Sequence, residues 1–188
     1  MEPIQSNKIY PIGIQNFEKM RKGGYFYVDK TALVYRLVKT GSYYFLSRPR
    51  RFGKSLLIST LEAYFQGKKE LFEGLAMEKL EKDWIKRPVL HIDLNIGKYD
   101  TPDSLDKQLE KAVTEWEQLY GTGMAESTLA LRFAGVVRRA CEQTGQRVAI
   151  LIDEYDKPML QAIGNEELQK VYRSILKPFY GVLKTMDG

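Results

Sequence analysis

The sequence contains very few of the residues that build metal clusters and nucleophilic triads. Its 188 residues include one cysteine, Cys141, and one histidine, His91. A single cysteine excludes a disulfide within the chain and a cysteine-rich metal cluster. A Ser-His-Asp or Cys-His triad would have to use His91, and no pattern around that residue indicates one. Any chemistry of this chain must therefore come from other residue types.

Long apolar runs are also missing. No stretch approaches the roughly 20 residues of a membrane span, and the N-terminus lacks the basic-then-apolar pattern of a signal peptide. We therefore expect a cytoplasmic protein with no membrane partner. A hydrophobic fraction of 44% and a charged fraction of 28% are typical of one globular domain, which we expect to span residues 1–188. The net charge of +5 favours polyanions, without the dense basic tract of a dedicated nucleic-acid-binding arm.

The stretch from Tyr43 to Leu57 has the layout of a phosphate-binding loop. Its sequence predicts an apolar strand over 43–47, a basic turn, and a helix that opens at Gly53-Lys54-Ser55. The N–H groups at the start of a helix have no partners within the helix, so they bind anions. Lys54 would add a positive charge at the outer phosphates, and the Ser55 hydroxyl would bind Mg²⁺.

The loop departs from the usual GxxxxGK[ST] pattern, which is called Walker A, because Arg48 stands at the first glycine. Pro49 fixes a turn there instead, and the neighbouring arginines make the loop strongly basic. An ordinary basic turn with an accidental Gly-Lys-Ser is the alternative. The residues that we expect to contact a nucleotide are Arg48, Arg50, Arg51, Phe52, Gly53, Lys54, Ser55 and Leu56.

A second motif follows an apolar run at residues 148–152, which predicts a strand buried on both faces. The run ends in Asp153-Glu154, which is the Walker B pattern. An Asp at this strand end can hold Mg²⁺, and the next Glu can orient and deprotonate an attacking water. Exposed acids at a strand exit are the alternative, but the combination with the Gly-Lys-Ser loop favours an NTPase.

The rest of the chain predicts helices and one more strand. That strand, at 89–95, has His91 and Asp93 on its less apolar face, and either Asp93 or Asn95 is an alternative contributor to the site. Cys141 and Trp116 are expected in the core, and Pro178 is expected to kink or interrupt the last helix. Helix starts are expected at the caps Asn16, Asp29, Thr101, Ser127 and Asn165, and a further helix is expected over 54–65.

Four stretches together resemble the bacterial and archaeal AAA-ATPase-like family. They are Ile12-Gly13-Ile14 with Phe17, Tyr27-Val28-Asp29-Lys30-Thr31, Arg48 to Ser55, and Ile152 to Pro158. The resemblance implies a P-loop NTPase of the ASCE type, with a three-layer α/β/α architecture and a mainly parallel sheet. It implies ATP and Mg²⁺ as cofactors, with Ser55 and Asp153 as metal ligands and Lys54 and Glu154 as catalytic residues. Members commonly carry a C-terminal PD-(D/E)XK nuclease-like domain.

The sequence stops before the strand that carries a polar sensor residue in such proteins, so the resemblance implies an N-terminal fragment. This leaves three hypotheses open, namely an ATP-hydrolysing enzyme, a nucleotide-dependent switch, and a DNA-associated ATPase. Arg50 or Arg51 would neutralise charge in the first case, or serve a neighbouring subunit if the chain self-associates. Adenine is preferred because no guanine-recognition motif is present, and Ile12 to Ile14 are candidates to line the base.

Overall fold

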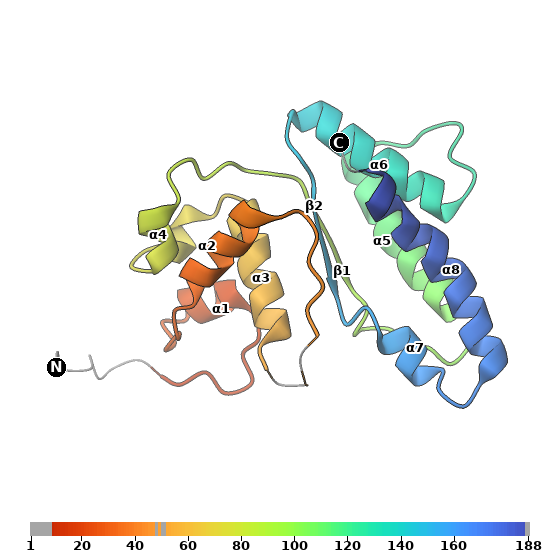
Figure 1. Ribbon diagram of the computed structural model, residues 1–188, viewed down its shortest axis with the longest axis horizontal. Coiled ribbons are helices and arrows are strands. Elements are labelled where there is room, and N and C mark those ends of the chain that lie inside the picture. The colour runs from red at the N-terminus through yellow and green to blue at the C-terminus, as the bar shows by residue number, and fades with distance from the viewer. Residues whose placement is uncertain (1–8, 48, 50–51, 187–188) are drawn as a thin grey trace. The chain divides into compact units, whose positions relative to one another are not determined.

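The computed structural model describes residues 9–47, 49 and 52–186. The chain divides into two compact units, Met1–Arg87 and Pro88–Gly188, which are described separately below. Both are visible in Figure 1, in red to yellow-green and in green to blue. The prediction of one domain over 1–188 stays a prediction.

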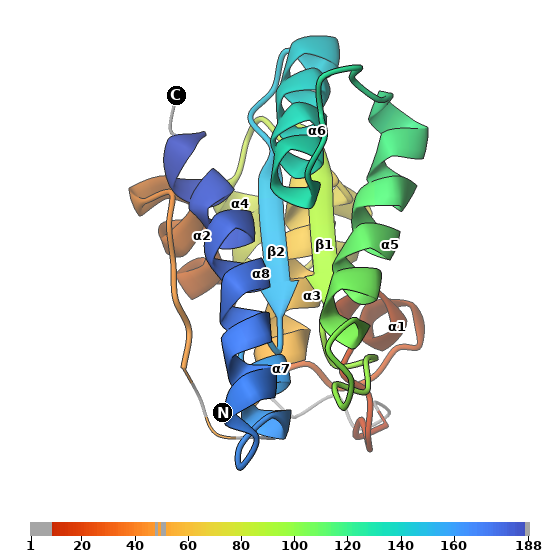
Figure 2. The same cartoon turned by 90° about the vertical axis from the view of Figure 1, so that its right-hand side faces the viewer.

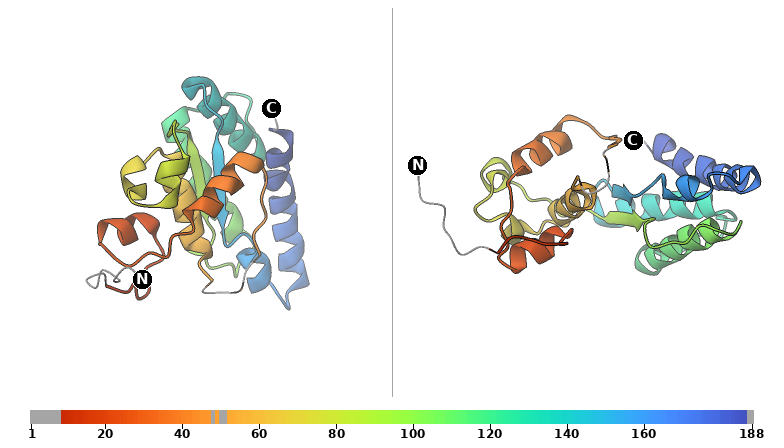
Figure 3. Two further views of the ribbon diagram at one scale, coloured as in Figure 1. Left: turned by 60° about the vertical axis from the view of Figure 1, so that its left-hand side comes forward. Right: turned by 90° about the horizontal axis from the view of Figure 1, so that it is seen from below.

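The first unit is built from helices around a small aromatic and aliphatic core. Its elements are α1 (Phe17–Lys22), α2 (Thr31–Thr40), α3 (Lys54–Phe65), a 3₁₀ turn η1 (Lys69–Phe72) and α4 (Ala76–Leu80). Helix α1 packs on α3, and α2 packs on α4 (Figure 3). Phe17, Phe72 and Met77 are completely buried between them.

Asp29 and Thr31 join two of these helices. One carboxylate oxygen of Asp29 accepts hydrogen bonds from the backbone N–H and the hydroxyl of Thr31, at 2.8 and 2.6 Å. The other accepts from the backbone N–H of Ala76 at 2.7 Å, and the Thr31 hydroxyl accepts from Met77 N–H at 3.0 Å. The Tyr-Val-Asp-Lys-Thr stretch therefore starts α2, one residue later than predicted, and also supplies the acceptors for the first turn of α4.

The second unit is a parallel two-stranded sheet, β1 (Val89–Asp93) and β2 (Ala149–Asp153), with helices over one face. Figure 2 shows α5 (Ser104–Tyr120), α6 (Leu129–Thr144) and α8 (Glu166–Thr185) in front of these strands. Leu90 and Ile92 of β1 belong to the same buried cluster as Phe133 and Phe179 of the helices, whose rings stack at 4.5 Å. The short helix α7 (Lys157–Gln161) follows β2 and was not predicted. The structure thus confirms an α/β protein with a parallel sheet.

The strand predicted at 43–47 is wrong. These residues lie outside β1 and β2, which form the whole sheet of the described residues, and Tyr43, Tyr44 and Phe45 are all exposed. Apolar composition favours a strand only where a neighbouring backbone pairs with it. The Tyr44 hydroxyl instead donates a hydrogen bond to the Leu37 carbonyl at 2.6 Å, near the end of α2.

Three smaller predictions also need correction. Cys141 is exposed, because it lies on the outer side of α6, whereas the inward-facing Val137 and Ala140 are buried. Thr128 rather than Ser127 caps α6, since its hydroxyl accepts from Leu131 N–H. Helix α8 runs through Pro178 without interruption, and buried Leu176 and Phe179 on either side hold it against the core.

Candidate functional site

The Gly-Lys-Ser motif, which is the candidate site of the first unit, lies at the N-terminus of α3. The helix begins at Lys54, as predicted, and Gly53 precedes it in the left-handed conformation, with φ 76° and ψ 25°. The first backbone bond of the helix runs from Leu57 N–H to the Gly53 carbonyl at 3.0 Å. The N–H groups of residues 54–56 therefore precede the helical ladder and belong to the anion-binding end of the helix.

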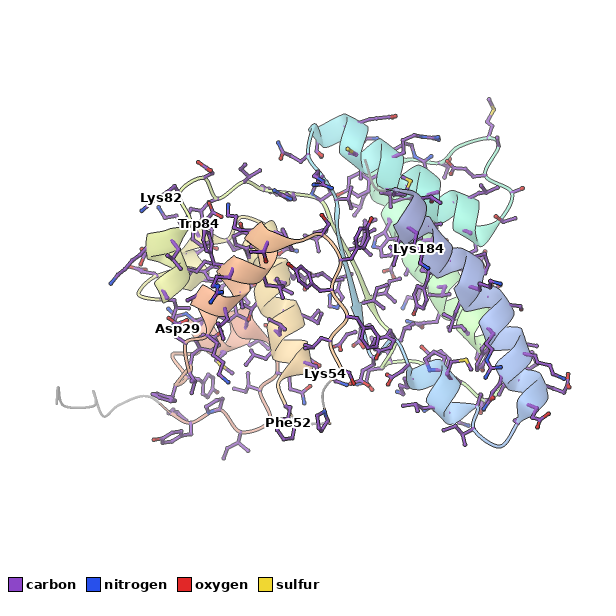
Figure 4. All side chains as sticks on the ribbon, viewed as in Figure 1. Asp29, Phe52, Lys54, Lys82, Trp84 and Lys184 are labelled. Carbon is purple, nitrogen blue, oxygen red and sulfur yellow. The ribbon has the colours of Figure 1, made fainter. Side chains whose placement is uncertain are left out.

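Side chains at this end of α3 differ in exposure. Phe52 is exposed, whereas Lys54, Ser55 and Leu56 are half-buried. Figure 4 shows Phe52 and Lys54 at the same end of the helix. The other three predicted contacts, Arg48, Arg50 and Arg51, lie outside the described residues. The structure thus brings five of the eight predicted nucleotide contacts together at one helix terminus: Phe52, Gly53, Lys54, Ser55 and Leu56.

One turn further along α3, Ser59 attaches the N-terminal part of the chain. Its hydroxyl accepts a hydrogen bond from Phe17 N–H at 2.9 Å and lies 3.4 Å from the Gln15 carbonyl. The start of α1 is therefore fixed beside the N-terminal half of α3. Sequence patterns did not reveal Ser59, because a serine inside a helix has no special signature.

The Asp-Glu motif, which is the candidate site of the second unit, lies at the end of β2. Asp153 is the last residue of the strand and only 7% exposed, and its Oδ1 accepts from Glu154 N–H at 2.9 Å. Glu154 has φ 52°, which is the left-handed region that residues with a Cβ avoid. Such a conformation costs about 1–2 kcal/mol and is concentrated at functional sites.

Asp93 lies next to Asp153. The two residues are partners in the parallel register of β1 and β2, so their side chains leave the same face of the sheet. Asp93 Oδ1 accepts from Asn95 N–H at 2.8 Å, so this aspartate, like Asp153, holds the turn that follows its own strand. This register supports the alternative that Asp93 contributes to the site at Asp153. The sequence of one strand does not reveal which residue of another strand lies beside it.

The loops that follow the two strands are bonded to each other. The Lys157 ammonium donates to the carbonyl and the side-chain oxygen of Asn95, and Gln161 Oε1 accepts from Tyr99 N–H at 2.8 Å. The Tyr99 hydroxyl donates to the Leu94 carbonyl at 2.9 Å, and burial, together with the nearby charge of Asp93, raises its pKa to about 12. Tyr99 therefore stays a neutral donor. These contacts attach the segment after β1 to α7, which follows β2.

Each of the two motifs carries an oxygen donor of the kind that Mg²⁺ prefers. Within the described residues there is no group of three or more His, Cys, Asp or Glu side chains that could hold a metal by itself. Mg²⁺ in nucleotide sites commonly uses one or two protein oxygens, with phosphate oxygens and water completing its octahedron. The first unit contains such an oxygen donor in the Ser55 hydroxyl, and the second unit contains one in the Asp153 carboxylate.

The structure is thus an α/β protein in which Gly53 precedes α3, which begins at Lys54 and Ser55, and in which β2 ends at Asp153. A family model described as "Predicted AAA-ATPase" matches residues 11–188, and the chain belongs to this AAA-ATPase-like family. The chain is also 41% identical, over 185 residues, to an uncharacterized protein in the vnfD 5′ region of Azotobacter chroococcum mcd 1. That match covers 97% of the chain and 36% of the relative's length.

No solved structure gave a significant match. In the part of the chain that the structure describes, no helix combines the length and the apolar character needed to span a membrane.

Proposed function

We propose that this chain binds ATP with Mg²⁺ and hydrolyses it. The observation that carries the proposal is the start of α3, where left-handed Gly53 leads directly into Lys54 and Ser55 at the first helical turn. This is the arrangement in which backbone N–H groups, the helix dipole and a lysine all act on one anion. Membership of a family of predicted ATPases supports the choice of nucleotide.

The residues at the start of α3 would bind the phosphates. The N–H groups of residues 54–56 donate to phosphate oxygens, and the Lys54 ammonium adds a charge-assisted hydrogen bond at the outer phosphates. Arg50 or Arg51 of the same loop would neutralise the negative charge that develops on the transferred group.

The residues at the end of β2 would carry out the proton transfer. Glu154 orients a water molecule and accepts its proton as the water attacks the outer phosphate. Ser55 and Asp153 would hold Mg²⁺, which neutralises charge on the phosphate oxygens. We also propose that the complete domain has the three-layer ASCE architecture that the resemblance implies.

Two variants separate binding from turnover. Lys54→Ala is expected to weaken MgATP binding about 10- to 100-fold in isothermal titration, because it removes a charged hydrogen bond. Lys184→Ala, at an exposed lysine of α8 (Figure 4), is the matched control and is expected to leave binding unchanged. Unchanged binding in Lys54→Ala would remove the basis of the proposal.

Glu154→Gln is expected to retain MgATP binding and to lower the rate of phosphate release by about 10²- to 10⁴-fold, the typical contribution of a general base. Turnover at the wild-type rate would show that another group accepts the proton. A wild-type protein that binds ATP tightly but releases almost no phosphate would instead favour the nucleotide-dependent switch.

A further inference from the structure

The outer side of α8, in the second unit, carries a concentrated strip of positive charge. Lys170, Arg173 and Lys177 are all exposed. They are spaced three and four residues apart, so they lie on one side of the helix, within about 60° of its circumference. We call these three residues the basic stripe. No Asp or Glu occurs in the sequence from residue 168 to residue 186, so no acidic residue of the same stretch interrupts the stripe.

The charge of the stripe is local, because the unit that carries it is acidic. Within residues 88–188, Asp and Glu together outnumber Lys and Arg. The exposed lysines of α5 have acidic neighbours one turn away, since Lys107 pairs with Asp103 and Lys111 lies 4.0 Å from Glu115. Such mixed charge is typical of a helix side that only faces water. The basic stripe differs from it in having a single sign.

The ion pairs of the stripe are few and weak. Lys170 pairs with Glu167 at 2.8 Å, but the two side chains are 65% and 84% exposed, and exposed pairs contribute only about 0–1 kcal/mol. With the residues that the structure describes, Arg173 and Lys177 form no ion pair. These two like charges are four residues apart, which destabilises a helix by about 0.2–0.5 kcal/mol. A bound anion would relieve this repulsion.

The side chains around the stripe favour nucleic acid over other polyanions. A helix that lies on an anionic membrane needs an apolar face that enters the lipid, and protein interfaces use apolar and aromatic anchors. All the large apolar side chains of α8 up to residue 183 belong to the buried core of the unit or pack against it. Beside the stripe the exposed residues are Ser174 and Pro178. The stripe therefore offers charge without an apolar anchor, which suits a phosphate backbone.

We propose that the basic stripe binds the phosphate backbone of double-stranded DNA. From Lys170 to Lys177 the stripe spans about 10 Å along the helix, a length over which one DNA strand presents about three phosphates. Each cationic side chain that contacts a phosphate releases a condensed counterion. Three contacts therefore contribute about −2.7 to the slope of log K against log salt concentration. Contacts to phosphates carry no sequence information, so binding is independent of DNA sequence.

The test measures binding of the full chain to a fluorescent DNA duplex between about 50 and 200 mM salt. We expect Lys170→Gln/Arg173→Gln/Lys177→Gln to bind at least about 10-fold more weakly at low salt, with a salt slope smaller by about 2.7. Glutamine resembles lysine and arginine in helix propensity, so α8 is retained, which circular dichroism checks. Lys170→Arg/Arg173→Lys/Lys177→Arg keeps the charge and is expected to bind within about twofold of wild type, because phosphate accepts either cation.

A matched control removes the same charge from another part of the same unit. Lys98→Gln/Lys107→Gln/Lys111→Gln replaces three exposed lysines, each of which has an acidic neighbour. Charges more than about 10 Å apart are largely screened at 0.1 M salt, so a change in net charge alone has little effect. We expect this variant to bind DNA within about twofold of wild type and to keep the wild-type salt slope.

Four results would overturn the proposal. If wild type binds no DNA at about 50 mM salt, or if the charge-removing stripe variant binds as wild type does, the stripe is not a DNA contact. If the matched control weakens binding as much as the stripe variant, binding follows net charge and not the stripe. If the charge-keeping variant also loses binding, the shape of the helix surface and not its charge is responsible. If the stripe variant keeps DNA binding but loses binding to vesicles of phosphatidylserine and phosphatidylcholine, the stripe binds a lipid surface instead.

Discussion

Glu154, which we propose as the general base, also has an unusual backbone conformation. The sequence identifies the carboxylate through the Asp-Glu motif, but it contains no signal for the left-handed φ of 52°. That conformation depends on the turn after β2, where Asp153 accepts from Glu154 N–H and Lys157 N–H donates to the Glu154 carbonyl. Here the positive φ is a consequence of the fold around the residue.

Glycine at this position is expected to stabilise the protein relative to a glutamine. Glu154→Gly and Glu154→Gln both remove the carboxylate, but only glycine adopts φ 52° without strain. We expect Glu154→Gly to have the larger free energy of unfolding in urea, by about 0.5–1 kcal/mol. Asp156→Gly is the control, because Asp156 has φ −91° and glycine should destabilise the chain there. If the two Glu154 variants are equally stable, Glu154 stores no strain.

Gly135 is required for a different reason, because a side chain at this position would collide with a neighbouring residue. A Cβ atom added there would lie 1.7 Å from Glu126 Oε1, and this carboxylate is only 9% exposed and ion-paired with Arg139. We expect Gly135→Ala to lower the free energy of unfolding by about 1–2 kcal/mol, since displacing Glu126 outweighs the better helix propensity of alanine. Gly181→Ala in α8, where no atom lies within 4 Å of the added Cβ, is expected to be neutral or stabilising. Equal effects in urea titrations would contradict this account.

At the level of helices and strands, the sequence predicted those elements that local signals define. Helix α3 begins and ends where Gly53 and Gln66 predict, and α8 begins after Asn165, whose side chain accepts from Leu168 N–H. The sequence-based predictions failed where the structure of a segment depends on contacts with a distant part of the chain. Residues 43–47 look like a strand by composition, but strand formation requires backbone pairing, and the role of Asp29 depends on a helix 47 residues away.

The junction of α2 and α3 with the segment after α4 depends on a buried carboxylate. Glu81 is 4% exposed, and its side chain accepts from the Tyr64 hydroxyl at 2.5 Å and pairs with the Lys39 ammonium at 2.9 Å. Burial alone would raise the pKa of Glu81, but the hydrogen bonds from Tyr64 and Lys39 outweigh it and lower the pKa to about 2. The charged carboxylate is thus stabilised in the folded state.

This pKa predicts a defined loss of stability in acid. Because the folded pKa lies below the unfolded value of 4.5, the contribution of Glu81 is complete above pH 4.5 and is lost as the pH falls towards about 2. We expect Glu81→Gln to be less stable than wild type at pH 7, with the difference narrowing from pH 4.5 to pH 2.5 in urea titrations. A difference that stays constant with pH would show that folding does not lower the pKa of Glu81.

For the whole molecule, the two motifs lie in different compact units of the chain. If one nucleotide is bound by both, then MgATP should slow amide hydrogen exchange at residues 53–57 and also at residues 153–157. Lys54→Ala should abolish the protection at both places, although the substitution lies in the first unit only. Protection confined to 53–57 would mean that the acidic strand end acts on something other than the bound phosphates.

The family and the type of sheet could be predicted from the sequence, but contacts between distant residues could not. The motifs sufficed to predict a family of ATPases and a parallel α/β sheet. Each motif consists of consecutive residues, so it can be recognised without the structure. The sequence did not contain the pairing of Asp93 with Asp153 or the attachment of α1 to α3 at Ser59. Both arise from contacts between residues far apart in the chain, which local patterns cannot encode.

The long-range bonds of the first unit have a consequence for its synthesis. Phe17 bonds to Ser59, Thr31 to Met77 and Arg21 to Leu71, so the first two helices find their partners 42 to 50 residues later. At a translation rate of about 5–20 residues per second, this delay is on the order of 2–10 s. During that time the apolar faces of α1 and α2 emerge from the ribosome with nothing to pack against. We therefore expect α1 to pack only after α3 has been made, and α2 to pack only after α4 has been made.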